Sequence, residues 1–235
     1  MKDDHWLSAI KCYDSEEERW RGRNFVDGGA RELARELQEA TKKEPTRFSD
    51  LSLKISDMAH NSYLEHILYC LAAAEAPSKE SLAQAVKRAH RHPKKPFGRE
   101  IARLIEKHPH IAADPEILEI LIWYALNGEA NESEDSDVKN TERETITVEM
   151  LIHRGERFRI RGINGARGWS WEALGAVLWQ VSAAENRAWE AIEIALEKET
   201  LISVRCCMMK PIVPLFNKSK DRFSAFIRKL IVLPD

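Results

Sequence analysis

The sequence is poor in the two residues that build tight turns. Its 235 residues include only 10 glycines and 9 prolines, whereas an all-β sandwich or barrel needs a turn roughly every 8–12 residues. A sheet-rich fold is therefore disfavoured. Because 43% of the residues are hydrophobic and 31% are charged, the composition is that of a globular protein that can bury a core. Helices are the elements that remain.

Cysteine and net charge are also scarce. Cys12 and Cys70 are isolated, and Cys206 and Cys207 are adjacent, so no Cys-x-x-Cys spacing exists for a metal or redox centre. We expect neither a disulfide framework nor a cofactor. The 36 lysines and arginines against 38 acidic residues give a formal charge of −2. Any binding to the phosphate backbone of a nucleic acid would have to be local.

Long apolar runs are missing as well. The first seven residues, MKDDHWL, lack the apolar core of a signal peptide. No run approaches the roughly 18 apolar residues that a membrane span requires. We therefore expect a cytoplasmic protein with no membrane partner.

What is present is helical periodicity. Ala30, Leu33, Ala34 and Leu37 recur at i, i+3, i+4 and i+7, with charged residues between them, which is typical of an amphipathic helix. Similar stripes predict helices around residues 48–58, 64–71, 78–93, 97–107 and 114–125. Ser78 and the Asp114-Pro115 pair suit the starts of two of these helices.

The composition changes sharply after residue 127. Residues 128–145 are mostly Gly, Asn, Ser, Asp and Glu, which cannot bury enough apolar surface to offset the entropy of ordering. We predict a flexible acidic linker or loop there, between an N-terminal helical-repeat block at 27–127 and a C-terminal one at 146–235. Residues 1–26 are left as an N-terminal extension.

The C-terminal block carries further stripes. A helix that begins near Val148 is expected to be interrupted at Arg154-Gly155. Clearer stripes predict helices at about 164–181, 188–196, 204–215 and 223–230. Pro211 would bend one of them, which curved helical repeats tolerate. Short helices joined by tight turns indicate stacked pairs, so we predict an all-α fold, a right-handed α-solenoid of stacked antiparallel helix pairs.

Residues 161–174 read RGINGARGWSWEAL and are followed by LISVR at 201–205. This region resembles a HEAT-type repeat. More narrowly, it is similar to the helical repeats in the C-terminal parts of bacterial STAND-type NTPases, many of them linked to antiphage defence. There an Asn-x-x-Arg-Gly helix start precedes an Ala/Leu-rich helix and a Val-Arg helix start. The likeness is clearest over 162–235 and looser over 27–127, and no Gly-x-x-x-x-Gly-Lys-Ser/Thr phosphate loop accompanies it.

The arginines and tryptophans of this region are candidate contact residues. An arginine that opens a helix, as Arg167 does, can bond carbonyl ends or acidic residues of the neighbouring repeat, and Gly168 permits close helix approach. Trp171 lies about 200° around the helix from Trp169. Trp169 is expected in the core, while Trp171 is either exposed as an anchor for a protein partner or buried against the linker or another repeat. The candidate protein-binding residues are Trp171, Arg167 and Arg161.

The strongest charge cluster is a basic run that could line a rim of the solenoid and hold phosphate. Such a run can equally be a solvated face or pair with the acidic residues at 129–144, and no interleaved aromatic residues offer base stacking. The candidate nucleic-acid-binding residues are Lys87, Arg88, Arg91, Lys94, Lys95, Arg99 and Arg103.

Catalytic patterns do not emerge. The pairs His60/His66, His90/His92 and His108/His110 lack the i, i+4 spacing of a helical metal site. Runs of carboxylates do not make a shared desolvated cleft, and Ser170 is not in a Gly-x-Ser-x-Gly turn. We therefore expect a non-enzymatic protein-interaction scaffold or sensor segment. The alternatives are a nucleic-acid-binding repeat that uses the basic run and a hydrolase with an unrecognised site.

Overall fold

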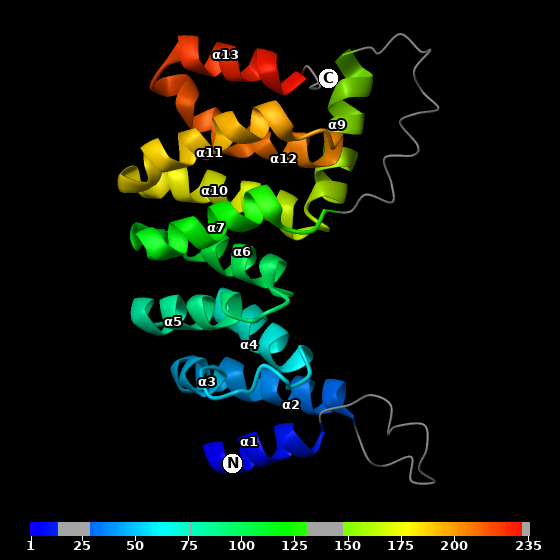
Figure 1. The fold of residues 1–235 in the computed structure, drawn as a ribbon, viewed down its shortest axis with the longest axis vertical. Helices are drawn as coiled ribbons and strands as arrows, with labels where there is room; N and C mark the ends of the chain where they lie inside the picture. Colours follow the sequence, from blue (N-terminus) through cyan, green and yellow to red (C-terminus); the bar gives the residue numbers. More distant parts are fainter. Residues whose placement is uncertain (14–28, 76, 131–147, 232–235) are drawn as a thin grey trace. The chain divides into compact units, whose positions relative to one another are not determined.

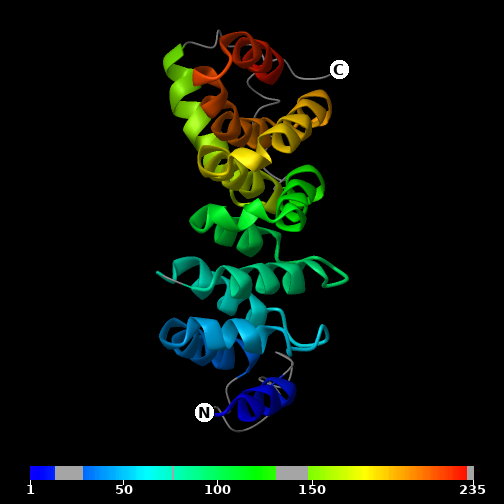
Figure 2. The same ribbon diagram turned by 90° about the vertical axis from the view of Figure 1, so that its left-hand side faces the viewer.

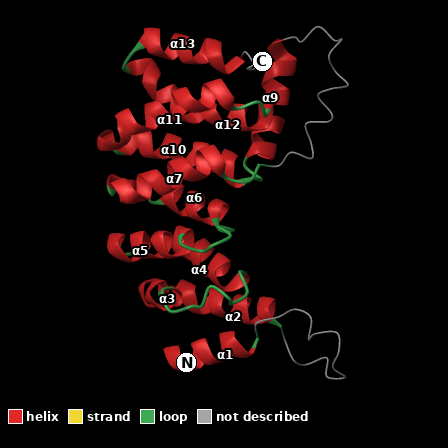
Figure 3. Cartoon of the chain, viewed as in Figure 1, coloured by secondary structure: helices red, strands yellow, loops and turns green. Residues whose placement is uncertain are grey.

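The computed structural model describes residues 1–13, 29–75, 77–130 and 148–231 (Figure 1). Every regular element in those ranges is a helix, which confirms the predicted all-α fold class (Figure 3). No helix among them is long and apolar enough to cross a membrane. The chain divides into two compact units, Met1–Lys107 and His108–Asp235, and most of the predicted linker lies outside the described residues.

Unit 1 is built from helices that alternate between two rows. Helix α2 packs on α4 and α4 on α6, while α3 packs on α5 (Figures 1 and 2). Between the rows lies an apolar core that includes the fully buried Phe48, Tyr63 and Phe97. The helices are α1 (Asp3–Cys12), α2 (Ala30–Lys43), α3 (Pro45–Ser52), α4 (Ser62–Ala73), α5 (Lys79–His90) and α6 (Gly98–Lys107).

Local sequence signals explain where these helices begin. Helix α5 starts after Ser78, whose hydroxyl accepts the backbone N–H of Ser81, as the sequence predicts. Helix α2 starts after Gly29, whose N–H donates to the Glu32 carboxylate at 2.9 Å. Pro45 occupies the first turn of α3, where its missing N–H costs nothing.

The described part of the N-terminal extension predicted at residues 1–26 contains a helix. Helix α1 buries Trp6 and Ile10, and the Trp6 ring meets Phe48 edge to face with centroids 5.8 Å apart. Arg47 Nε also donates to Asp3 at 2.8 Å. Two buried residues one turn apart make too short a stripe to stand out in the sequence.

Unit 2 begins before the predicted linker. Helix α7 packs on α10 and α11, so the helix that ends at residue 127 belongs with the C-terminal helices rather than with the N-terminal block. Helix α10 also packs on α12, which packs on α9, and α11 packs on α13. The elements are η2 (Pro109–Ala113), α7 (Pro115–Asn127), α9 (Val148–Gly162), α10 (Ala166–Gln180), η4 (Ser182–Ala184), α11 (Glu185–Lys198), α12 (Ile202–Ile212), η5 (Val213–Asn217) and α13 (Lys220–Ile231).

Two predictions about helix boundaries in unit 2 have opposite outcomes. Asp114 caps α7 as predicted, because its carboxylate accepts the Glu116 N–H at 2.9 Å. The predicted interruption at Gly155 is wrong, since α9 runs through it to Gly162. A glycine inside a helix costs only about 1 kcal/mol relative to alanine, which the packing of α9 on α12 can offset.

Candidate functional site

Arg167 opens α10 and ties it to two other segments of unit 2. Its Nε donates to the carbonyl of Gly128 at 3.2 Å, and its Nη1 reaches the Glu199 carboxylate at 3.2 Å. The Arg167 backbone N–H donates to the Glu129 carbonyl at 3.0 Å. The prediction that this arginine bonds a carbonyl end and an acidic residue of neighbouring elements is confirmed. Its guanidinium therefore serves internal contacts.

The glycine after Arg167 permits the close approach that the sequence predicts. A Cβ built on Gly168 would lie 2.2 Å from the carbonyl oxygen of Gly162. That distance is below any ordinary non-bonded contact, and the obstacle is backbone, which cannot rotate away. Only glycine lets the start of α10 lie this close to the end of α9.

Arg205 makes the second arginine clamp, on α12. Its side chain is buried and donates to the carbonyl of Leu230 at 2.8 Å and to that of Glu199 at 2.8 Å. It also bonds the carbonyls of Leu196 and Lys229. One guanidinium thus satisfies carbonyls at the C-terminal ends of both α11 and α13. Burial lowers the pKa of Arg205 from its ordinary value.

The structure places Trp171 in the core, one of its two predicted positions, and leaves Trp169 less buried than expected. Trp171 is fully buried, whereas Trp169 keeps part of its surface exposed. Helix α10 is enclosed by α7, α9 and α12, so nearly all its faces are buried and a single apolar stripe does not define its interior. Trp171 is a core residue and cannot anchor a partner. Arg161 is half-buried, with its guanidinium carbon 5.7 Å from the Phe158 ring centroid.

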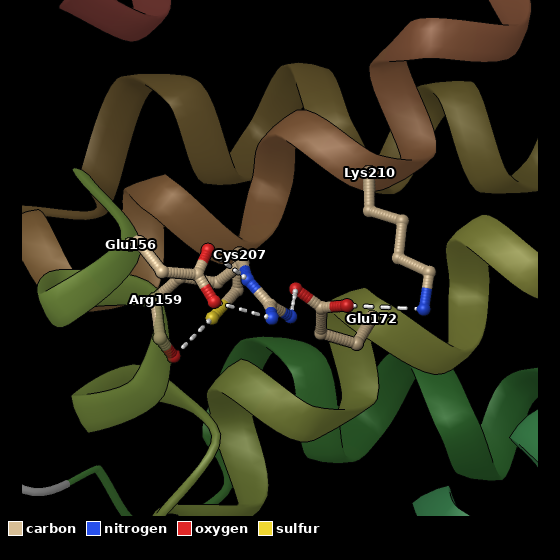
Figure 4. A network of polar contacts seen from close by, with 5 residues as sticks. All are labelled: Glu156, Arg159, Glu172, Cys207 and Lys210. Carbon is tan, nitrogen blue, oxygen red and sulfur yellow. Dashed lines mark hydrogen bonds and ion pairs between the residues drawn. The ribbon is translucent and has the colours of Figure 1, made fainter. Parts of the chain in front are cut away.

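Glu172 is a buried carboxylate that the sequence analysis missed. One of its oxygens receives Arg159 Nη1 from α9 at 3.2 Å, and the other receives Lys210 Nζ from α12 at 3.0 Å (Figure 4). Glu156 holds the other side of the Arg159 guanidinium at 2.9 Å. The available signal was the placement of this glutamate directly after Trp171 in an otherwise apolar stretch.

Cys207 lies beside this network. Its thiol donates to the Arg159 carbonyl at 3.6 Å (Figure 4), and burial raises the pKa of the thiol above its ordinary value. A thiol that stays protonated is a poor nucleophile. The carboxylate of Glu172 is held by two cations, so this cluster braces α9, α10 and α12 rather than presenting a reactive group.

In the basic run of unit 1, some residues make internal contacts and others are exposed. Arg88 is engaged, because its guanidinium bonds the Ile55 carbonyl and pairs with Asp57 at 2.6 Å. Lys95 is engaged too, with its Nζ 2.8 Å from the His90 carbonyl. These two cations hold the loops after α3 and α5 in place.

The remaining members of the run differ in exposure. Arg103 lies over the ring of Tyr69, 4.2 Å from its centroid, and Lys87 is half-buried. Arg91, Lys94 and Arg99 are exposed. The run therefore does not form one continuous rim of solvated cations.

A groove of about 860 Å³ is hollowed into unit 1. Arg31 and Arg35 line it from α2, Glu65 and His66 from α4, and Lys94 from the loop after α5. The histidines of the groove do not form a metal site, since no group of three or more potential ligands gathers anywhere in the described ranges. The other lining residues are Asp57, Met58, Ala59, His60, Asn61, Ser62, His92 and Pro93.

Several exposed apolar side chains of unit 2 lie toward the ends of its helices. Met209, Val213 and Phe216 follow one another at i, i+4 and i+7 and are 38%, 44% and 47% exposed. Trp179, 57% exposed, stands one turn beyond Gly175, which lies against Lys210 and Pro211. Helix α10 also contacts η5. We call these four residues the apolar stripe.

Comparison with protein-family models, with curated proteins and with solved structures finds no match to this chain.

Proposed function

We propose that this chain is a non-enzymatic protein-interaction scaffold, a right-handed α-solenoid of HEAT-like antiparallel helix pairs that resembles the repeat segments of STAND-type defence NTPases. The observation that carries the interaction role is the apolar stripe of Met209, Val213, Phe216 and Trp179. A folded protein rarely leaves such side chains together on its surface unless they contact something.

The stripe stands out because many charged side chains of unit 2 are used in internal contacts. Glu193 of α11 pairs with Arg222 of α13 at 3.0 Å, and Glu185 of α11 pairs with Lys218, which follows η5. The carboxylate of Glu172 is likewise engaged. These contacts join one helix to the next. Phe216 also packs edge to face on Phe223, with ring centroids 5.2 Å apart, yet the four side chains of the stripe stay 38–57% exposed, which favours the stripe as the working surface.

The chemistry of the stripe suits one kind of partner. Lys220 borders it, with its Nζ 5.8 Å from the Phe216 ring centroid, and Trp179 supplies a large flat anchor. We propose that the occupant is an amphipathic helix of another protein, with its apolar face on the stripe and acidic residues beside Lys220. The apolar stripe takes the place of Trp171 as the candidate protein-binding site, because Trp171 is buried.

The test is a pull-down from source cells that compares the native chain with Trp179→Ala/Phe216→Ala. A matched control, Leu53→Ala/Met58→Ala, removes exposed apolar side chains from unit 1 instead. We expect the native chain and the control to retain one protein at high salt, because apolar contacts resist screening. The stripe variant should lose it. The purified partner should then bind the native chain directly, with no other protein present.

Two results would contradict the proposal. Equal recovery by all three chains, each verified as folded by circular dichroism, would show that the stripe is not the interface. Recovery of nucleic acid only, released at moderate salt, would favour binding through the exposed Arg91, Lys94 and Arg99 instead.

A further inference from the structure

We propose that the groove of unit 1 is a binding site for a small phosphate-bearing ligand. This inference is independent of the proposed function, since it concerns a different unit and different residues. The groove brings together Arg31, Arg35 and Lys94 from two segments about sixty residues apart in the chain. Guanidinium and ammonium groups that converge on one hollow are typical of phosphate recognition.

The two arginines are placed to act as a pair. Arg31 and Arg35 are four residues apart on α2 and both are exposed, so they lie on the same face of the helix, one above the other. Two guanidinium groups at this spacing can hold separate oxygens of one phosphate or of two linked phosphates. Arg35 makes no ion pair with any described residue.

The charge in the groove favours a dianion. Three cations face two carboxylates, Asp57 and Glu65, and the Asp57 carboxylate is already neutralised by Arg88 at 2.6 Å. The start of α4 at Ser62 also lines the groove and adds the partial positive charge of a helix N-terminus. A phosphate monoester carries a charge of about −1.5 to −2. This charge matches the excess positive charge of the groove better than that of a ligand with a single carboxylate group.

Histidines hold the walls of the groove in a fixed geometry. His92 Nδ1 accepts the Lys94 backbone N–H at 3.2 Å, so its Nε2 is the proton-bearing atom that donates to the Asp57 carbonyl at 3.1 Å. His60 Nδ1 similarly accepts the Ser62 N–H at 3.3 Å. The loops after α3 and α5 are thereby held in one conformation before a ligand binds, which lowers the conformational entropy lost on binding.

The size of the groove points to a small molecule. Its volume of about 860 Å³ falls in the range of roughly 300–1,000 Å³ that ligand sites occupy. No Phe, Tyr or Trp is among its lining residues, so it lacks the large aromatic platforms on which the bases of a single-stranded nucleic acid stack.

The test is a calorimetric titration of the full chain with inorganic pyrophosphate at physiological salt. The site variant is Arg35→Gln/Lys94→Gln. The matched control is Arg91→Gln/Arg99→Gln, which removes the same charge from exposed positions outside the groove. Because all four side chains are exposed, both variants should keep the native circular dichroism spectrum. We expect the site variant to bind at least roughly tenfold more weakly, as the loss of charge-assisted hydrogen bonds implies.

A second readout locates the ligand. Pyrophosphate should shift the imidazole resonances of His60 and His66, which line the groove, and leave those of His5 and His108 unchanged. The proposal is overturned if the native chain shows no saturable binding or if both variants lose affinity equally. It is also overturned if a short oligonucleotide depends on Arg35 and Lys94 while pyrophosphate does not bind, since the surface would then serve a nucleic acid.

Discussion

Two pairs of arginines, one in each unit, are used in different ways. In unit 2 the guanidinium groups of Arg205 and Arg167 turn inward and bond carbonyls and a carboxylate of other helices. In unit 1 those of Arg31 and Arg35 are exposed at a groove. Arg88 is the intermediate case, since it is mostly buried and braces a loop. The same type of side chain braces the fold in unit 2, where carbonyl ends surround it, and lines an exposed groove in unit 1.

This difference shows why a helix-opening arginine is weak evidence for an interface. A guanidinium has five donors in a rigid fork, and the turn between two helices exposes the carbonyls that those donors can satisfy. Arg167 and Arg205 stand at such turns, so their donors are consumed within the fold. Arg31 and Arg35 lie in the first two turns of α2, where they line a groove.

The largest effect should come from Arg205→Ala. Its removal leaves buried carbonyls of α11 and α13 without donors, so we expect the free energy of unfolding to fall by about 3–5 kcal/mol. Arg35→Ala, the matched change in unit 1, should alter it by no more than about 0.5 kcal/mol. Urea unfolding followed by circular dichroism measures both. Equal losses would erase the proposed distinction between the two units.

Glycine substitutions in unit 2 should give effects of opposite sign. Gly168→Ala places a Cβ against the Gly162 backbone and should cost about 1–3 kcal/mol. Gly155→Ala meets nothing within 4 Å and should stabilise α9 by roughly 0.5–1 kcal/mol. Thermal unfolding of the two variants compares them directly. A loss of stability in Gly155→Ala would mean that α9 needs flexibility at this point.

The smallest effect should come from the exposed ion pair between α7 and α11. Arg187 contacts both oxygens of the Glu119 carboxylate, at 2.6 and 3.0 Å. An exposed pair of this kind contributes about 0.2–1 kcal/mol, so Arg187→Ala should lower the midpoint of unfolding slightly at low salt. The difference from the native chain should vanish at high salt. A large, salt-independent loss would place Arg187 among the internal clamps.

Periodicity and helix caps predicted the elements whose signals are local. Helices α2, α5 and α7 begin where their stripes and the caps at Ser78 and Asp114 indicate. The clamp made by Arg167 and the close approach at Gly168 followed from the chemistry of those residue types. In each case the residues that determine the structure lie close together in the sequence.

The position of Trp171 could not be predicted in the same way. A helical stripe identifies the buried face only when the helix has one covered side, and α10 is covered by α7, α9 and α12. The groove of unit 1 also escaped the sequence analysis. It joins Arg35 to Lys94, and no pattern within one helix brings together residues so far apart in the chain.

Arg205 also bears on how the last helices of unit 2 come apart. Its donors are divided between the C-terminal ends of α11 and α13, so α13 cannot fray alone without stranding a buried positive charge. Detachment of α13 or α11 therefore makes the folded state of the remaining two helices less stable. The last three helices should open as a single cooperative unit, and their amide protons should exchange at similar rates although α13 is the most exposed of the three.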